Sequence, residues 1–78
     1  MNFVIYSKDN CPYCTQIKQV MDMLGLKHVV YKLGEHFSKD DFYLEFGEGS
    51  TFPQVVLNET KLGGCKDTIT YLREQKIL

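Results

Sequence analysis

The apolar and polar positions of the chain predict four short strands and three helices. Phe3–Tyr6 is an uninterrupted apolar run, which is typical of a short buried strand. After the polar loop 7–10, apolar residues recur at the i, i+3, i+4 and i+7 spacing of a helix, at Ile17, Val20, Met21 and Leu24. This helix is expected to have Pro12 in its first turn and to end at Gly25.

A second β-rich run, Lys27–Leu33, follows this helix. Because a helical crossover of roughly thirteen residues separates the two strands, we expect them to be parallel. After a turn at Gly34–Phe37, Ser38 has the character of an N-cap, with two aspartates in the first turn behind it. Phe42 and Phe46 then lie four residues apart on one face of a second helix.

The flexible, glycine-rich stretch 47–50 ends the second helix, and three further elements follow it. They are a strand, a short strand and a helix, at Gln54–Leu57, Lys61–Leu62 and from Cys65 or Lys66 to Gln75. Asn58–Glu59 is the expected hairpin turn, and the last helix is expected to bury Ile69 and Leu72. The order βαβαββα predicts an α/β fold with a parallel pair of strands and an antiparallel hairpin.

Composition limits the kind of protein. A chain of 78 residues is sized for one domain, 1–78, and 44% hydrophobic residues suffice for a small core without disulfide staples. Nine basic and ten acidic residues are scattered and leave a net charge of −1. This pattern argues against nucleic acid or an anionic membrane surface as a partner.

The first residues are not expected to form a targeting segment. Met1–Lys8 is apolar for only four residues and lacks a basic n-region and a long h-region, and no run approaches a membrane span. We therefore expect a reducing, cytoplasmic location. In that compartment a CxxC motif is typically catalytic or metal-binding rather than a structural bridge.

Cys11-Pro12-Tyr13-Cys14 is such a motif, at the start of the first predicted helix. Unpaired N–H groups and the macrodipole at a helix N-terminus favour a thiolate, the species that attacks disulfides. Cys11, at the N-cap and with Lys8 nearby, is the expected nucleophile, with a pKa below the free value of roughly 8.5. Cys14 is expected to be the more buried, resolving thiol.

A zinc site is the alternative use of these cysteines. Cys11, Cys14, His28 and His36 form C-x2-C-x13-H-x7-H, which is near a zinc-finger spacing. However, His28 falls inside a predicted strand and the helix begins at the cysteines. The pattern therefore favours redox chemistry, with no metal, over zinc.

Three separated motifs give the chain a wider resemblance. They are Lys8-Asp9-Asn10-Cys11-Pro12-Tyr13-Cys14, Thr51-Phe52-Pro53 and Gly63-Gly64-Cys65-Lys66-Asp67. Their order and spacing resemble those of the small dithiol glutaredoxins of bacteria and viruses, over nearly the whole chain. The resemblance implies a thioredoxin-like fold, with a four-stranded mixed sheet flanked by three helices.

In the second motif, the resemblance implies a cis peptide bond at Pro53, facing the CxxC. The N–H and C=O of Phe52 would then pair with an incoming thiol peptide like a short strand. A strand-entry turn without a ligand role is the alternative. Most relatives have valine where Phe52 stands, so its larger ring is expected to narrow the groove.

In the third motif, the resemblance implies a site for the γ-glutamyl end of glutathione, at a helix start. The backbone around Gly64 and Cys65 would hold the carboxylate, with Lys66 beside it, and Asp67 would hold the ammonium group. Helix capping alone is the alternative reading, and Cys65 is expected to be non-catalytic.

Basic residues at the other end of the expected glutathione site are few. Many relatives carry an arginine or glutamine before Thr51 to hold the glycine carboxylate of glutathione, whereas residues 46–50 of this chain include no base. Glu48 in this stretch is expected to repel that carboxylate. Lys8 is thus the expected base there. The residues expected to bind glutathione are Lys8, Tyr13, Thr51, Phe52, Pro53, Gly64, Cys65, Lys66 and Asp67.

The expected activity is glutathione-dependent reduction of protein disulfides and glutathione mixed disulfides by a monomer without a tightly bound cofactor. Ribonucleotide reductase is one candidate among the protein partners. One alternative is a redoxin that thioredoxin reductase serves, which has no need of a γ-glutamyl site. The other is a non-enzymatic metal or iron–sulfur carrier, against which Pro12 and Cys14 argue.

Overall fold

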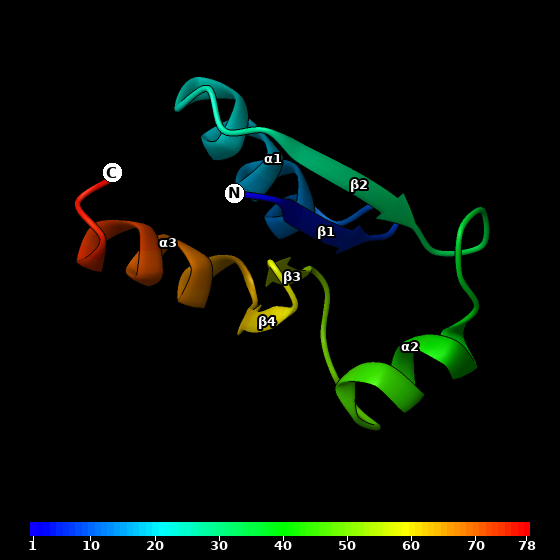
Figure 1. The fold of residues 1–78 in the computed structure, drawn as a ribbon. Helices are drawn as coiled ribbons and strands as arrows, with labels where there is room; N and C mark the ends of the chain where they lie inside the picture. Colours follow the sequence, from blue (N-terminus) through cyan, green and yellow to red (C-terminus); the bar gives the residue numbers. More distant parts are fainter.

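The computed structural model describes residues 1–78 and shows a four-stranded mixed sheet with three helices (Figure 1). The elements in chain order are β1 (Phe3–Ser7), α1 (Pro12–Met23), β2 (His28–Lys32), α2 (Lys39–Phe46), β3 (Gln54–Leu57), β4 (Thr60–Gly63) and α3 (Cys65–Glu74). The strand order is β2-β1-β3-β4, with β1 parallel to β2 and antiparallel to β3. The predicted α/β topology, its parallel pair and its hairpin are confirmed.

The main core lies between one face of the sheet and the helices α1 and α3. Alternate residues of β1 and β3 point to this face, because side chains alternate along a strand. The buried residues of this core are Phe3, Ile5, Ile17, Met21, Val55, Leu57, Cys65 and Leu72. Burial of this apolar surface fixes α1, and with it the cysteine motif, against the end of a central strand.

The opposite face of the sheet is only partly covered. In Figure 1, α2 lies beyond the carboxyl ends of β1 and β2, and its Phe46 ring lies 5.0 Å from that of Tyr6. Val29 remains 50% exposed on this face. The buried strand predicted for Phe3–Tyr6 is confirmed for Phe3 and Ile5, whereas Val4 and Tyr6, on this open face, are only half-buried.

The ends of the elements follow the predicted signals closely. Ser38 caps α2 by accepting a hydrogen bond from the Asp41 N–H at 3.1 Å, and Gly25 follows α1 with φ +67°. Asn58 and Glu59 both have positive φ, as the tight hairpin turn between β3 and β4 requires. None of the helices is long and apolar enough to cross a membrane.

The buried stripe of α3 differs from the predicted one. Thr68 is fully buried, whereas Ile69 is only half-buried. A threonine is tolerated in this position because its hydroxyl donates a 2.8 Å hydrogen bond to the Gly64 carbonyl, so no polar group is left without a partner. Leu72 is buried as predicted.

Candidate active site

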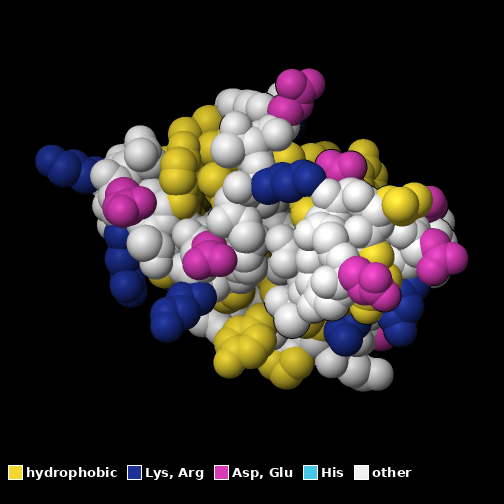
Figure 2. Space-filling model, turned by 90° about the horizontal axis from the view of Figure 1, so that it is seen from below, with side chains coloured by type: hydrophobic (Ala, Val, Ile, Leu, Met, Phe, Trp, Pro, Cys, Tyr) yellow, Lys and Arg dark blue, Asp and Glu magenta, His cyan; other side chains and the backbone are white.

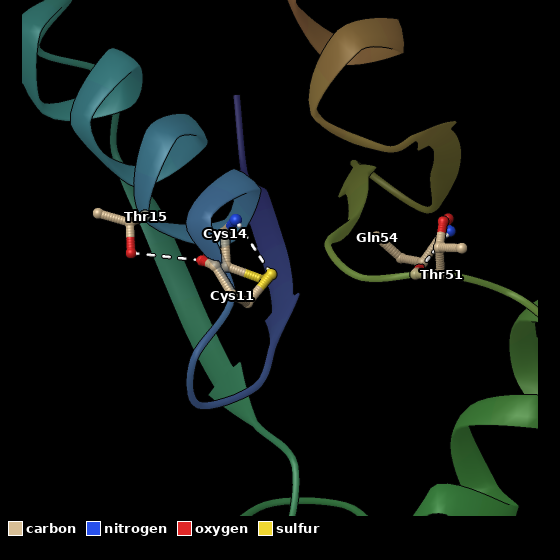
Figure 3. Close-up of a disulfide and its surroundings, with 5 residues drawn as sticks. All are labelled: Cys11, Cys14, Thr15, Thr51 and Gln54. Atoms are coloured by element: carbon tan, nitrogen blue, oxygen red, sulfur yellow. Dashed lines mark hydrogen bonds between the residues drawn. A yellow bond between two sulfur atoms is a disulfide. The ribbon is translucent and has the colours of Figure 1, made fainter.

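The two cysteines of the CxxC motif form a disulfide at the start of α1 (Figure 3). Cys11 is the N-cap of the helix, and its Sγ accepts a hydrogen bond from the Cys14 N–H at 3.2 Å. Once the pair is reduced, this N–H and the helix dipole would stabilise negative charge on the Cys11 sulfur. Cys14 is 1% exposed and Cys11 is half-buried, so the two sulfurs are unequally accessible.

The loop that leads to Cys11 is held by ionic contacts from β2. Lys32 at the end of β2 lies 3.0 Å from Asp9 and 3.3 Å from Glu35. Hydrogen bonds with Asp9 first, and with Glu35 second, raise the pKa of Lys32 above its ordinary value. The negative charge of Asp9, two residues before Cys11, is thus compensated by a neighbouring cation.

The segment before β3 lies across from the disulfide, as Figure 3 shows for Thr51. The Phe52–Pro53 peptide bond is cis, which confirms the prediction for Pro53. The Gln54 side chain donates a 2.9 Å hydrogen bond to the Thr51 carbonyl and so ties this segment to β3. Tyr13 from α1 faces the same segment across a common hollow.

That hollow has a volume of about 300 Å³ and is built from α1, the cis-proline segment and the start of α3. Its lining consists of Tyr13, Thr51, Phe52, Pro53, Gly64, Cys65, Lys66 and Asp67. Eight of the nine residues expected to bind glutathione are therefore brought together from three separate parts of the chain. The ninth, Lys8, lines a second hollow beside the first.

The start of α3 combines free N–H groups with a carboxylate. The N-cap is Gly64, which provides no side-chain hydrogen bond to the first turn, and Asp67 lies in that turn. Gly63 has φ +105°, and a Cβ at this position would collide with the Asp67 carboxylate. Glycine at 63 therefore leaves room for the Asp67 side chain beside the hollow.

The second hollow, of about 550 Å³, shares Tyr13, Thr51 and Phe52 with the first. It contains two lysines, Lys8 and Lys39. No sequence motif includes Lys39, which directly follows the Ser38 cap and reaches the groove only because α2 lies against the cis-proline segment. Together the two hollows form a groove with Asp67 and Lys66 at one end and the ammonium groups of Lys8 and Lys39 at the other.

Glu48 does not line either hollow of the groove. It lines a neighbouring depression on α2 with Asp40, Leu44 and Tyr43, and Tyr43 also lines the second hollow. Repulsion between Glu48 and a carboxylate in the groove stays a prediction. On the underside of the molecule, basic and acidic side chains are interspersed among hydrophobic ones (Figure 2).

The residues of the alternative zinc pattern are not assembled. His28 lies 2.9 Å from the Leu26 carbonyl and 3.6 Å from Asp22, and His36 accepts a hydrogen bond from the Lys32 N–H. No three His, Cys, Asp or Glu residues are grouped so that they could hold a metal ion. The zinc-finger reading therefore has no site in this fold.

The third cysteine, Cys65, is a free and buried thiol on the wall of the first hollow. Only 6% of the residue is exposed, and burial raises the pKa of its thiol. A raised thiol pKa means less thiolate at neutral pH, and the thiolate is the reactive species.

We therefore predict that iodoacetamide at pH 7 alkylates Cys65 of the reduced protein at least about ten-fold more slowly than Cys11. Peptide mass spectrometry after timed quenching measures both rates in one sample. In guanidinium chloride the two rates should converge, because burial is lost. Equal rates in the folded protein would contradict the prediction.

A mixed sheet of this topology, with a dithiol at the start of its first helix, defines the class of thioredoxin-fold redox proteins. The sequence model of the glutaredoxin family matches residues 3–62. A glutaredoxin of Vernicia fordii is 32% identical over 78 residues, which cover 96% of this chain and 75% of the relative. The chain belongs to the glutaredoxin family and is a thiol–disulfide oxidoreductase.

Solved structures agree with this fold. Reduced Escherichia coli glutaredoxin superimposes with a TM-score of 0.83 at 22% identity, over 100% of both chains. A buckwheat glutaredoxin in complex with glutathione has a TM-score of 0.75 at 26% identity, over 96% of this chain and 71% of its own. The thioredoxin-like fold implied by the three motifs is thus confirmed.

Proposed function

We propose that the protein reduces protein disulfides and glutathione mixed disulfides with glutathione as its reductant, as a monomer in a reducing, cytoplasmic compartment. The observation that carries this proposal is the charge pattern of the groove. Asp67 and the open start of α3 suit an α-amino acid end, and Lys8 and Lys39 suit a carboxylate at the other end. Glutathione carries these charges at its two ends and a thiol between them.

In the proposed reaction, the Cys11 thiolate attacks the glutathione sulfur of a mixed disulfide, and the protein thiol leaves as a thiolate. A second glutathione then attacks the Cys11–glutathione disulfide, releasing oxidised glutathione and restoring the Cys11 thiolate. With a protein disulfide, the Cys11 thiolate attacks one sulfur to form a Cys11–protein mixed disulfide, and the other protein sulfur leaves as a thiolate. Cys14 then attacks the Cys11 sulfur, which forms the Cys11–Cys14 disulfide and releases the reduced protein. Two glutathione molecules then reduce the Cys11–Cys14 disulfide, so each cycle oxidises two glutathione molecules to one disulfide.

The cis-proline segment would hold the substrate during this exchange. Phe52 and Tyr13 line the same hollow, where an extended thiol peptide could pair with the Phe52 N–H and C=O. Among protein partners, ribonucleotide reductase and other proteins with exposed disulfides are the candidates. No tightly bound cofactor is required, because glutathione enters as a co-substrate.

The test is reduction of a small glutathione mixed disulfide with glutathione as the only thiol, followed through glutathione reductase and NADPH. Parallel reactions replace glutathione and its reductase with thioredoxin reductase. Turnover with glutathione alone supports the proposal. Turnover with thioredoxin reductase only would overturn it, and stoichiometric iron or another metal in the purified protein would favour a carrier.

Asp67→Asn should raise the KM for the glutathione mixed disulfide about ten-fold, because a charged hydrogen bond contributes about 1.5 kcal/mol. The substitution keeps the side-chain shape beside Gly63 and removes only the charge. Steady-state kinetics should show little change in kcat. Glu74→Gln, at the far end of α3, is the matched control, and an equal rise of KM in both variants would contradict a local role for Asp67.

A further inference from the structure

The ring of Phe52 points into a cluster of aromatic side chains beneath the groove. It stacks on Phe42 of α2, with ring centroids 4.1 Å apart and planes inclined by 11°. Phe37 lies next to this stack, with its centroid 6.2 Å from that of Phe52. Phe42 is 1% exposed, so the stack is anchored in a part of the structure that cannot shift freely.

The same ring lies beneath a cation. The Lys8 ammonium is 5.3 Å from the centroid of the Phe52 ring, within the range of a cation–π interaction. No carboxylate lies within 4.0 Å of Lys8, whereas Lys32 and Lys61 are each paired with an acidic side chain. The contact with Phe52 is therefore the specific interaction that restrains this otherwise exposed side chain.

Lys8 occupies a junction in the site. It lines the second hollow of the groove together with Phe52, and it also lines the depression that contains Cys11. An unrestrained lysine side chain, with its four methylene groups, adopts many rotamers. Binding an anion would then cost the conformational entropy of fixing one of them. A restrained ammonium at this junction faces the groove before the substrate arrives.

We propose that Phe52 is a positioning residue, whose ring holds the Lys8 ammonium in place for an anionic group of the thiol substrate. This inference rests on the proposed use of glutathione. In the proposed function the Phe52 backbone would pair with the substrate, and its ring gives the segment a second function. The ring links the cation of the first loop to the buried aromatic cluster of α2.

The first test asks whether the contact exists in solution. The ε-methylene protons of Lys8 should resonate upfield of those of lysines that contact no aromatic ring, because the adjoining ammonium lies over Phe52. Lys61, whose ammonium lies 5.3 Å from the Phe46 ring centroid, should show a similar shift that Phe52→Leu leaves unchanged. NMR spectra should show that the Lys8 shift disappears in Phe52→Leu and persists in Phe37→Leu, which disturbs the cluster without touching Lys8. A Lys8 shift that is absent in the wild type, or unchanged in Phe52→Leu, would overturn the proposal.

The second test is a double-mutant cycle on the KM for the glutathione mixed disulfide. Phe52→Leu should raise this KM about two- to five-fold, the range of an exposed cation–π contact, with kcat unchanged. In a Lys8→Met background the same substitution should have almost no further effect, and Phe37→Leu should leave KM near the wild-type value.

The outcomes separate this inference from the proposed function. Wild-type turnover with glutathione, combined with an equal effect of Phe52→Leu in both backgrounds, would overturn only the positioning role. A wild-type protein that does not turn over glutathione at all would overturn the proposed function, and the positioning role with it. An effect of Phe52→Leu on KM that appears only when Lys8 is present supports both the positioning role and the proposed function.

Discussion

Replacement of Cys11 by serine should abolish thiol–disulfide exchange, whereas Cys14→Ser should retain reduction of glutathione mixed disulfides. Cys11 is the accessible sulfur at the N-cap, and the Cys14 N–H points at it. A serine hydroxyl at this position stays protonated at neutral pH and cannot form the mixed disulfide. We expect the activity of Cys11→Ser to fall by about three orders of magnitude or more.

Cys14→Ser removes only the internal resolving thiol. Because a second glutathione can attack the Cys11 mixed disulfide directly, about one-tenth or more of the wild-type rate should remain with a glutathione mixed disulfide. Reduction of a protein disulfide should fall much further, since it needs the second cysteine to release the product. The same assay with both substrates measures the two effects.

The two cysteine variants are each other's controls, because each removes the disulfide and leaves the helix intact. Thermal melts should show that both fold. If Cys14→Ser were inactive toward the mixed disulfide and Cys11→Ser active, the assignment of nucleophile and resolving thiol would have to be exchanged.

The largest effect on stability is expected at Phe42. This side chain is 1% exposed and contacts the rings of Phe37, Phe46 and Phe52. Phe42→Ala leaves a cavity that these stacked rings cannot fill, which should lower the free energy of unfolding by about 3 kcal/mol or more. A domain of this size would lose roughly 12–24 °C in Tm for that change.

Urea denaturation with an unchanged m-value measures this loss. Leu44→Ala is the control, because Leu44 lies on the same helix but is 86% exposed, and we expect a change within about 0.5 kcal/mol. A similarly small change for Phe42→Ala would show that the aromatic cluster is not a stabilising core.

The sequence predicts the fold well because each element carries a local signal. The Ser38 cap, the Asn58–Glu59 turn and the spacing of Ile17 and Met21 mark the element ends and the buried face of α1 without tertiary information. Thr68 is different. Its burial depends on the Gly64 carbonyl that its hydroxyl meets, which composition alone does not reveal.

The candidate site likewise combines residues that the sequence motifs predict with residues that only the fold brings to the groove. The contiguous motifs identify the residues around the first hollow, including Pro53 and Asp67. Lys39 belongs to no motif and joins the groove only through the placement of α2. The direction of the Phe52 ring is likewise set by Phe42, a residue ten positions away, so its contact with Lys8 cannot be predicted from the motif.

The dithiol and the α2 side of the groove are attached to the sheet in different ways. The cysteines follow an inner strand that is paired on both sides, whereas Lys39 and the support of Phe52 belong to α2, which is attached through side chains. Local opening of α2 would disturb recognition and leave the dithiol in place. Substrate preference can therefore drift during evolution through substitutions in α2, while the exchange chemistry is inherited unchanged.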